Sequence, residues 1–282
     1  MKRQKSFNND LATLYVVATP VGNLKEMTPR AIEVLKDVDV IACEDTRQTR
    51  KLCEAFDIKT QLIAHHGHNT MQSVNGIIEL LKDNQNVAIV SDAGYPLISD
   101  PGQELVTRVV SEGFNVVPIS GSSALLNGLV ASGIVAQPFL FHGFLPSTKK
   151  QCRRTLKEYE FFSYTMVLYV AVHRLKETLE MILEIWGDRQ VCLAREMTKL
   201  HEEFLRGSLK DVIEECDDLK GEFVLVIEGN AHEKEADLAE IDIKRMIEEL
   251  IEKGLSASSA VKEVAAKTSL SKNKVYDIYL KQ

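Results

Sequence analysis

The stretch that decides the predicted fold is VAIVSDAGYPLISDPG, residues 87–102. Its first four residues are apolar and mostly β-branched, which predicts a buried strand. Asp92 follows the strand and precedes Ala93-Gly94, small residues that let a backbone approach a ligand. Two interpretations stay open: a loop that holds a small cofactor by main-chain contacts, or a long turn capped by the aspartate.

Around this stretch, short apolar runs alternate with segments of helical period through the first half of the chain. Such an order predicts a mainly parallel sheet covered by helices on both faces. Ligands in these sheets bind off the carboxyl ends of the strands. The strands are expected at 14–18, 38–42, 61–64, 87–91 and 116–119, with helices from Pro29, at 73–82 and at 103–110.

Three loops of small residues follow strands of this sheet: residues 19–23, 91–102 and 120–124. Each is a weak signal alone, but loops at the carboxyl ends of neighbouring parallel strands lie at one edge of the sheet. We therefore expect them to converge on one crevice. The glycine-rich dinucleotide fingerprint and the phosphate-binding P-loop pattern are both missing from the sequence.

The second half predicts another αβ unit after a break at 137–150. Strands at 166–172, 190–194, 203–206 and 222–228, with helices at 175–185 and 209–215, suggest a mixed sheet. Beyond it, residues 228–252 carry three basic and nine acidic side chains, whereas 255–282 carry five lysines and two acids. Serines open helical runs at 256 and 271, which predicts a small helix-turn-helix-like appendage. The expected domains are 1–140, 141–230 and 231–282.

The overall charge is −7, from 34 basic and 41 acidic residues among 282. Such an acidic chain does not attract nucleic acid through its mean field, so a polyanionic partner requires local basic patches. The five cysteines are scattered without a paired motif, which favours neither disulfides nor zinc. Neither a signal peptide nor a membrane span is expected, and we predict a cytoplasmic protein without membrane or metal. The cluster His65-His66-Gly67-His68 is interpreted as a turn or substrate-facing loop.

Basic residues gather at two places. Arg47 opens a predicted helix after the second strand, either as part of a solvated cap or as a contact to a substrate phosphate. The second place lies beside Phe144 and Tyr159, where the alternatives are a stripe that contacts phosphates and a solvated helix face. It comprises Lys149, Lys150, Arg153, Arg154 and Lys157.

Between Leu14 and Leu280 the chain resembles the small-subunit ribosomal RNA (cytidine-2′-O)-methyltransferases, a branch of the tetrapyrrole methylase-like superfamily. The resemblance rests on five separate motifs that follow one another in the family's order. The motifs are TPVGNL at 19–24 with Thr28 and Arg30-Ala31, CEDTR at 43–47, SDAG at 91–94 through Pro101-Gly102, AREMTK at 194–199 and KGEF at 220–223. The resemblance implies an α/β fold class with two αβα-type domains, a homodimer, and S-adenosyl-L-methionine bound between the domains. It also implies that the product is a 2′-O-methylcytidine in small ribosomal subunit RNA.

The resemblance assigns site residues position by position. The implied cofactor contacts are Pro20, Asp92, Ala93, Gly94, Ser122, Ser123, Ala124, Val170, Ala171, Arg195, Glu222 and Phe223. The basic residues expected to meet RNA are Arg30, Arg47, Lys149, Lys150, Arg153, Arg154, Lys262, Lys272 and Lys274.

The chain departs from the family pattern at two places. Residues 170–172 read VAV where the family usually has Glu-Ser-Pro, and Gly67 stands where the family usually has a glutamate. A ribose hydroxyl needs a proton acceptor as it attacks a methyl group. The candidates are Glu44, Asp45, Asp100, His66 and His68, of which we select Glu44 and Asp100 as catalytic. Two alternatives stay open: a methylase of small tetrapyrroles, and a catalytically silent RNA-binding or ribosome assembly protein.

Overall fold

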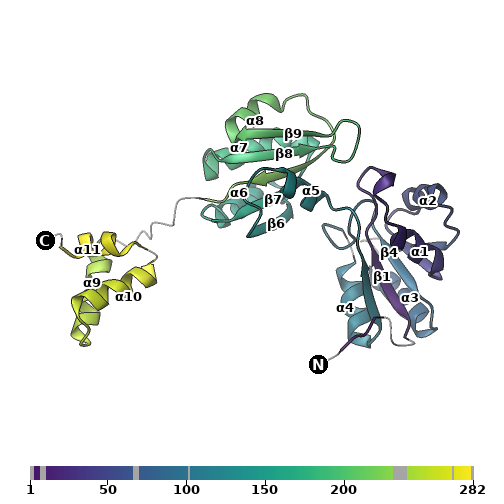
Figure 1. Ribbon diagram of the computed structural model, residues 1–282, viewed down its shortest axis with the longest axis horizontal. Coiled ribbons are helices and arrows are strands. Elements are labelled where there is room, and N and C mark those ends of the chain that lie inside the picture. The colour runs from purple at the N-terminus through teal and green to yellow at the C-terminus, as the bar shows by residue number, and fades with distance from the viewer. Residues whose placement is uncertain are drawn as a thin grey trace.

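The computed structural model describes residues 3–6, 11–65, 70–100, 102–230, 240–268 and 270–280. Within these residues the strands form two five-stranded sheets, and a separate group of helices follows the second sheet (Figure 1). Among the described helices, none has both the length and the apolar character needed to cross a membrane.

The first sheet is parallel throughout, as the alternating sequence pattern predicts, and its strand order is β3-β2-β4-β1-β5. Its strands are β1 (Thr13–Val17), β2 (Val40–Cys43), β3 (Gln61–Ala64), β4 (Val87–Val90) and β5 (Asn115–Ile119). The connecting segments are η1 (Leu24–Glu26), α1 (Pro29–Asp37), α2 (Thr46–Ala55), α3 (Thr70–Lys82) and α4 (Gln103–Glu112).

Helices cover both faces of this sheet. Ala31 and Leu35 of α1 are buried with Ile41 on one face, while Ile77 of α3 and Leu105 of α4 are buried on the other. Successive strand residues point to opposite faces, so buried strands feed two cores at once. Thr28 caps α1 by accepting a hydrogen bond from the Ala31 amide, ahead of a proline at the first helical position.

The second sheet is mixed, with strand order β6-β7-β10-β8-β9. Only the β6 and β7 pair is parallel, and the other three pairs are antiparallel. Its elements are β6 (Phe139–Phe144), α6 (Lys149–Glu158), β7 (Thr165–Ala171), η2 (Val172–Arg174), α7 (Leu175–Trp186), β8 (Gln190–Arg195), β9 (Glu203–Ser208), α8 (Leu209–Glu215) and β10 (Glu222–Ile227).

The interpretation of residues 137–150 as a break is wrong for 139–144, which form the edge strand β6. The glycine and proline in this segment suggested a loop, but Gly143 lies in a β-bulge and the preceding aromatic residues pair with β7. The second sheet therefore begins before residue 141, where the expected second domain starts.

Helix α5 (Ala124–Ala131) follows the last strand of the first sheet but packs on the second. Leu129 is buried with Val167, Ala194 and Val224 of three strands of that sheet. A Cβ atom on Gly128 would lie 2.8 Å from a methyl carbon of Val224, so the glycine lets helix and sheet approach closely. The segment after β5 thus crosses from one sheet to the other.

The last described helices are α9 (Glu240–Glu252), α10 (Ala257–Thr268) and α11 (Lys272–Leu280). They share a core of their own that includes Ile247, Val261, Val264 and Val275. The expected helix-turn-helix-like pair is therefore packed on the acidic helix α9, and these helices make one unit.

Candidate active site

Three loops meet at the carboxyl ends of β4, β1 and β5, which are neighbours in the first sheet. Thr19 and Gly94 form an antiparallel bridge, with backbone hydrogen bonds of 2.9 and 3.0 Å. The Tyr95 hydroxyl accepts a hydrogen bond from the Gly121 amide at 3.3 Å. The Ser122 hydroxyl donates to the Glu26 carboxylate at 2.7 Å. These bonds join the loops that the sequence predicted to converge.

The joined loops form one wall of a cleft of about 530 Å³, and strand ends of the second sheet form the other wall. This volume lies within the usual range of small-molecule sites. The lining residues are Val21, Glu44, Asp92, Ala93, Gly94, Tyr95, Ile98, Ser99, Asp100, Ser123, Ala124, Phe144, Tyr169, Val170, Ala171, Val172, Glu196, Met197, Lys199, Gly221, Glu222, Phe223 and Val224.

Carboxylates dominate the charge of the cleft. On the first wall, Asp100 is half-buried, and desolvation followed by repulsion from Glu44 raises its pKa to about 6. Desolvation also raises the pKa of Asp92, with a contribution from Asp45. The cleft thus offers a negative field to a cationic ligand and a carboxylate suited to accept a proton near neutral pH.

The second wall carries the cation of this cleft lining, Lys199. Its ammonium group lies 3.0 Å from both the Glu196 and the Glu222 carboxylates. Its aliphatic stem fills the space beside Gly22, where a Cβ atom would lie 2.5 Å from it. The Thr198 hydroxyl donates to the Val21 carbonyl, so this loop joins the two walls.

Strained backbone surrounds the cleft. Leu97, Ser99, Glu196 and Thr198 all have positive φ angles, between 48° and 71°. Such conformations are costly for residues other than glycine and concentrate at functional sites. No sequence signal marks these four positions, because none is a glycine or an asparagine.

Most of the expected cofactor residues line the cleft, but Pro20, Ser122 and Arg195 do not. Ser122 instead bonds Glu26, and the Arg195 guanidinium binds the Lys220 carbonyl and the Glu203 carboxylate. Both selected catalytic residues, Glu44 and Asp100, line the cleft. His66 and His68 lie outside the described residues, and no group of three metal-ligating side chains occurs in the part that is described.

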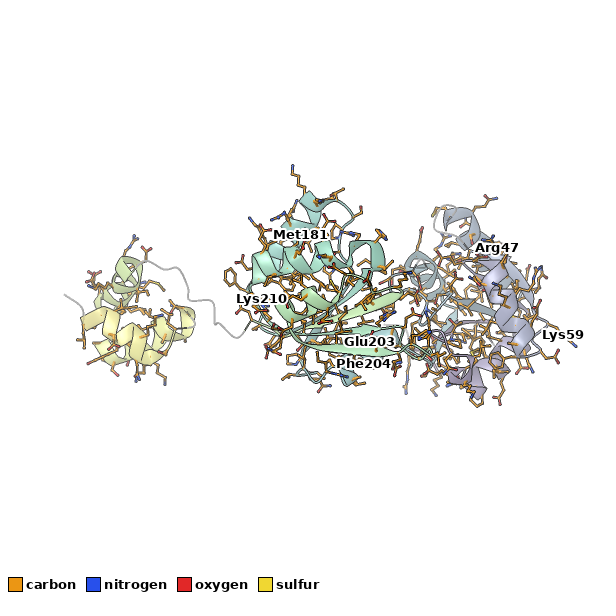
Figure 2. The ribbon with its side chains drawn as sticks, turned by 90° about the horizontal axis from the view of Figure 1, so that it is seen from above. Arg47, Lys59, Met181, Glu203, Phe204 and Lys210 are labelled. Atoms are coloured by element: carbon orange, nitrogen blue, oxygen red, sulfur yellow. The ribbon has the colours of Figure 1, made fainter. Side chains whose placement is uncertain are left out.

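Asp45 is the N-cap of α2 rather than part of the cleft lining. It accepts hydrogen bonds from the Arg47 amide and guanidinium, and these bonds lower its pKa to about 2. The Arg47 side chain is 88% exposed on the outer surface of the first unit (Figure 2). The cap interpretation of this segment is thus confirmed, and the guanidinium stays accessible to solvent.

The other expected RNA contacts are exposed on three parts of the chain: Arg30 on α1, the basic stripe on α6, and Lys262, Lys272 and Lys274 on the last two helices. Within the stripe, three cations have carboxylate partners. These pairs are Lys149–Glu177, Arg153–Glu184 and Arg154–Glu158. Exposed ion pairs contribute little to the stability of the fold, so these side chains can exchange a carboxylate partner for a phosphate at low cost in free energy.

Much of the second wall lies outside the set of expected site residues, including Tyr169, Glu196, Lys199 and Gly221. Antiparallel sheets lack the rule that places ligands at the carboxyl ends of parallel strands. The usable signal was the glycine in KGEF: Gly221 has a φ of +108°, and a Cβ atom there would meet the Glu196 carboxylate.

Comparisons with known proteins place the chain in a family. The model of the family described as Tetrapyrrole (Corrin/Porphyrin) Methylases matches residues 13–213. In solved structures, a uroporphyrin-III-C-methyltransferase from Thermus thermophilus aligns with a TM-score of 0.54 and 18% identity, covering 77% of this chain and 94% of the other. A cobalt precorrin-4 methyltransferase aligns with a TM-score of 0.56 and 16% identity, covering 76% and 94%. These two likenesses concern the fold alone.

Nearly full-length relatives are much more similar. Proteins named ribosomal RNA small subunit methyltransferase I are 47% identical in Bacillus subtilis (99% of this chain, 98% of the relative) and 43% in Halalkalibacterium halodurans (99% and 99%). The one from Synechocystis is 41% identical (96% and 98%). The chain therefore belongs to the tetrapyrrole methylase family and, within it, to the group of the ribosomal RNA small subunit methyltransferases I.

Proposed function

We propose that this protein transfers a methyl group from S-adenosyl-L-methionine to the ribose 2′-hydroxyl of a cytidine in small-subunit ribosomal RNA. One observation carries the proposal: an acidic cleft between the two sheets, in a chain 47% identical over 99% of its length to a ribosomal RNA methyltransferase.

The cleft residues fit the proposed cofactor. Gly94 has a φ of +78°, a conformation that favours glycine, and residues 92–94 line the cleft, so a ligand there would meet their backbone. Ser123 and Ala124 on one wall, with Val170 and Phe223 on the other, would hold the remainder. When bound, the cofactor supplies an electrophilic methyl group on a cationic sulfonium, and the carboxylates of the first wall match that positive charge.

The residues of this chain then have two tasks. The first is alignment, because an in-line displacement gains most from holding the reactants in place. The second is removal of the hydroxyl proton. Asp100 is ionised above its pKa of about 6 and is a stronger base than an ordinary aspartate. Glu44 is the second candidate, since it lines the same cleft and repels Asp100.

RNA is expected to contact the exposed basic side chains of α1, α2, α6 and the last two helices, since the acidic remainder repels phosphates. A homodimer in the cytoplasm belongs to the same proposal. The division into domains 1–140, 141–230 and 231–282 stays a prediction.

A methylase of small tetrapyrroles is the second candidate, because the family model that matches residues 13–213 is described as Tetrapyrrole (Corrin/Porphyrin) Methylases. The first loop argues against it, since those enzymes typically carry a glycine-rich G-x-G-P-G-D-P segment where residues 18–23 read ATPVGN.

One experiment separates the candidates. The protein is incubated with methyl-labelled S-adenosyl-L-methionine and small subunits from a strain that lacks the gene, and the RNA is digested to nucleosides. Labelled 2′-O-methylcytidine is the expected product. A different labelled nucleoside would refute the specificity, and subunit binding without label would favour the silent assembly protein.

A further inference from the structure

Phe144 lines the cleft and is 55% exposed. Its ring packs edge-on against Tyr169, with 5.5 Å between centroids, and Tyr169 packs in the same way against Phe141 at 4.9 Å. Tyr169 itself packs against the buried core that α5 shares with the second sheet. The exposed ring is therefore held on one side and open on the other.

A β-bulge brings this ring to the cleft. Phe141 pairs with Val167 and Gly143 with the next residue, Leu168, so two residues of β6 are used for one step of β7. In a regular strand, positions 141 and 144 point to opposite faces. Here both rings pack on Tyr169. Bulges re-aim side chains in this way and occur next to active sites.

The bulge depends on Gly143, which has a φ of +77°. A Cβ atom on this glycine would lie 2.9 Å from the hydroxyl oxygen of Ser99, in the loop of the first wall that precedes Asp100. Phe144 thus follows a residue that approaches the loop of the first wall, and it lines the same cleft as the proposed base.

The surroundings select what the ring can bind. The facing wall carries Glu44, Asp92 and Asp100, which repel a phosphate. Ile98 and Val172 are also exposed in the cleft lining, and they extend the apolar surface. A flat, uncharged group suits this place, and unpaired bases of RNA characteristically stack on such aromatic side chains.

We propose that Phe144 is the stacking platform for the base of the target nucleotide, which positions the attached ribose for reaction in the cleft. This inference rests on the proposed function and deepens it. The ring acts as a substrate-positioning group, and the Gly143 bulge holds it in place.

The test compares full-length variants by their kinetics on unmethylated small subunits and by calorimetric titration with S-adenosyl-L-methionine. Phe144→Ala should lower kcat/KM roughly 10- to 100-fold, the usual effect of losing one stacked base, with unchanged cofactor affinity. Phe144→Tyr should restore most of the activity, because it keeps the ring, whereas Phe144→Leu should not. Gly143→Ala should resemble Phe144→Ala, because it disturbs the bulge.

The matched control is Phe161→Ala, which removes a phenylalanine that is 52% exposed and absent from the cleft lining. It should leave both measurements unchanged. The inference is overturned if Phe144→Ala has the same kcat/KM as the wild-type protein. It is also overturned if the affinity of Phe144→Ala for the cofactor falls in parallel with kcat/KM, because the ring would then lie against the cofactor. Absence of 2′-O-methylcytidine with the wild-type protein would instead refute the proposed function.

Discussion

Replacing Asp100 by asparagine should make the protein more stable at alkaline pH while it removes most of the activity. The ionised carboxylate of Asp100 destabilises the folded protein, because desolvation and repulsion from Glu44 raise its pKa from 3.8 to about 6. That rise corresponds to a preference of roughly 3 kcal/mol for the neutral form. Asp100 is only half-buried, so screening by solvent reduces the contribution to about 1.5 kcal/mol.

The sign follows from proton binding. Between about pH 4 and pH 6, folded Asp100 keeps a proton that the unfolded chain has already released. The free energy of unfolding of the wild-type protein therefore falls as the pH rises through this window. Asparagine does not titrate, so the variant avoids this loss.

Thermal denaturation of the two proteins across this pH range measures the effect. Their melting temperatures should agree near pH 4, and the variant should melt roughly 3 to 6 °C higher near pH 8. A difference that does not change with pH would refute the raised pKa. Methyl transfer by the variant should fall by about 10²- to 10⁴-fold. Retained transfer would exclude Asp100 as the base without affecting the stability argument.

Three other changes test separate parts of the structure. Glu44→Gln should move the acidic limb of the pH–activity profile to lower pH, because Glu44 raises the pKa of Asp100; an unmoved limb would contradict the pairing. Gly128→Ala should lower the free energy of unfolding by about 1 to 3 kcal/mol in denaturant titrations, since its Cβ would lie 2.8 Å from a valine of β10. The matched control Gly76→Ala, in α3 with no atom within 4 Å of its Cβ, should raise it by about 0.5 to 1 kcal/mol. Removing residues 240–282, whose described helices share one core, should weaken subunit binding and flatten its salt dependence with cofactor affinity intact; equal loss of both would assign the unit a role in folding.

The first wall could be predicted because its chemistry follows from topology. Once the strands were recognised as parallel, their carboxyl ends had to share one edge, and loops 19–23, 91–102 and 120–124 had to meet there. The structure adds the bonds that join them, such as the bridge between Thr19 and Gly94.

The second wall could not be predicted in the same way. Lys199 reaches the cleft because Glu196 and Thr198 adopt left-handed backbone conformations that their residue types do not favour. The strand β6 was missed because its bulge breaks the alternation on which recognition of strands depends. Both failures occur where tertiary contacts override local preference.

The crossing of α5 has a mechanical consequence. Ser123 caps this helix and lines the cleft, while Leu129, less than two turns further on, is fixed in the core of the second sheet. A rotation that widened the gap between the sheets would therefore carry this part of the cleft with the second sheet, although it follows a strand of the first. Opening and closing of the gap between the sheets would then change the shape of the cleft as well as its width. The contacts to a bound ligand and the angle between the two sheets would be mechanically coupled through one short helix.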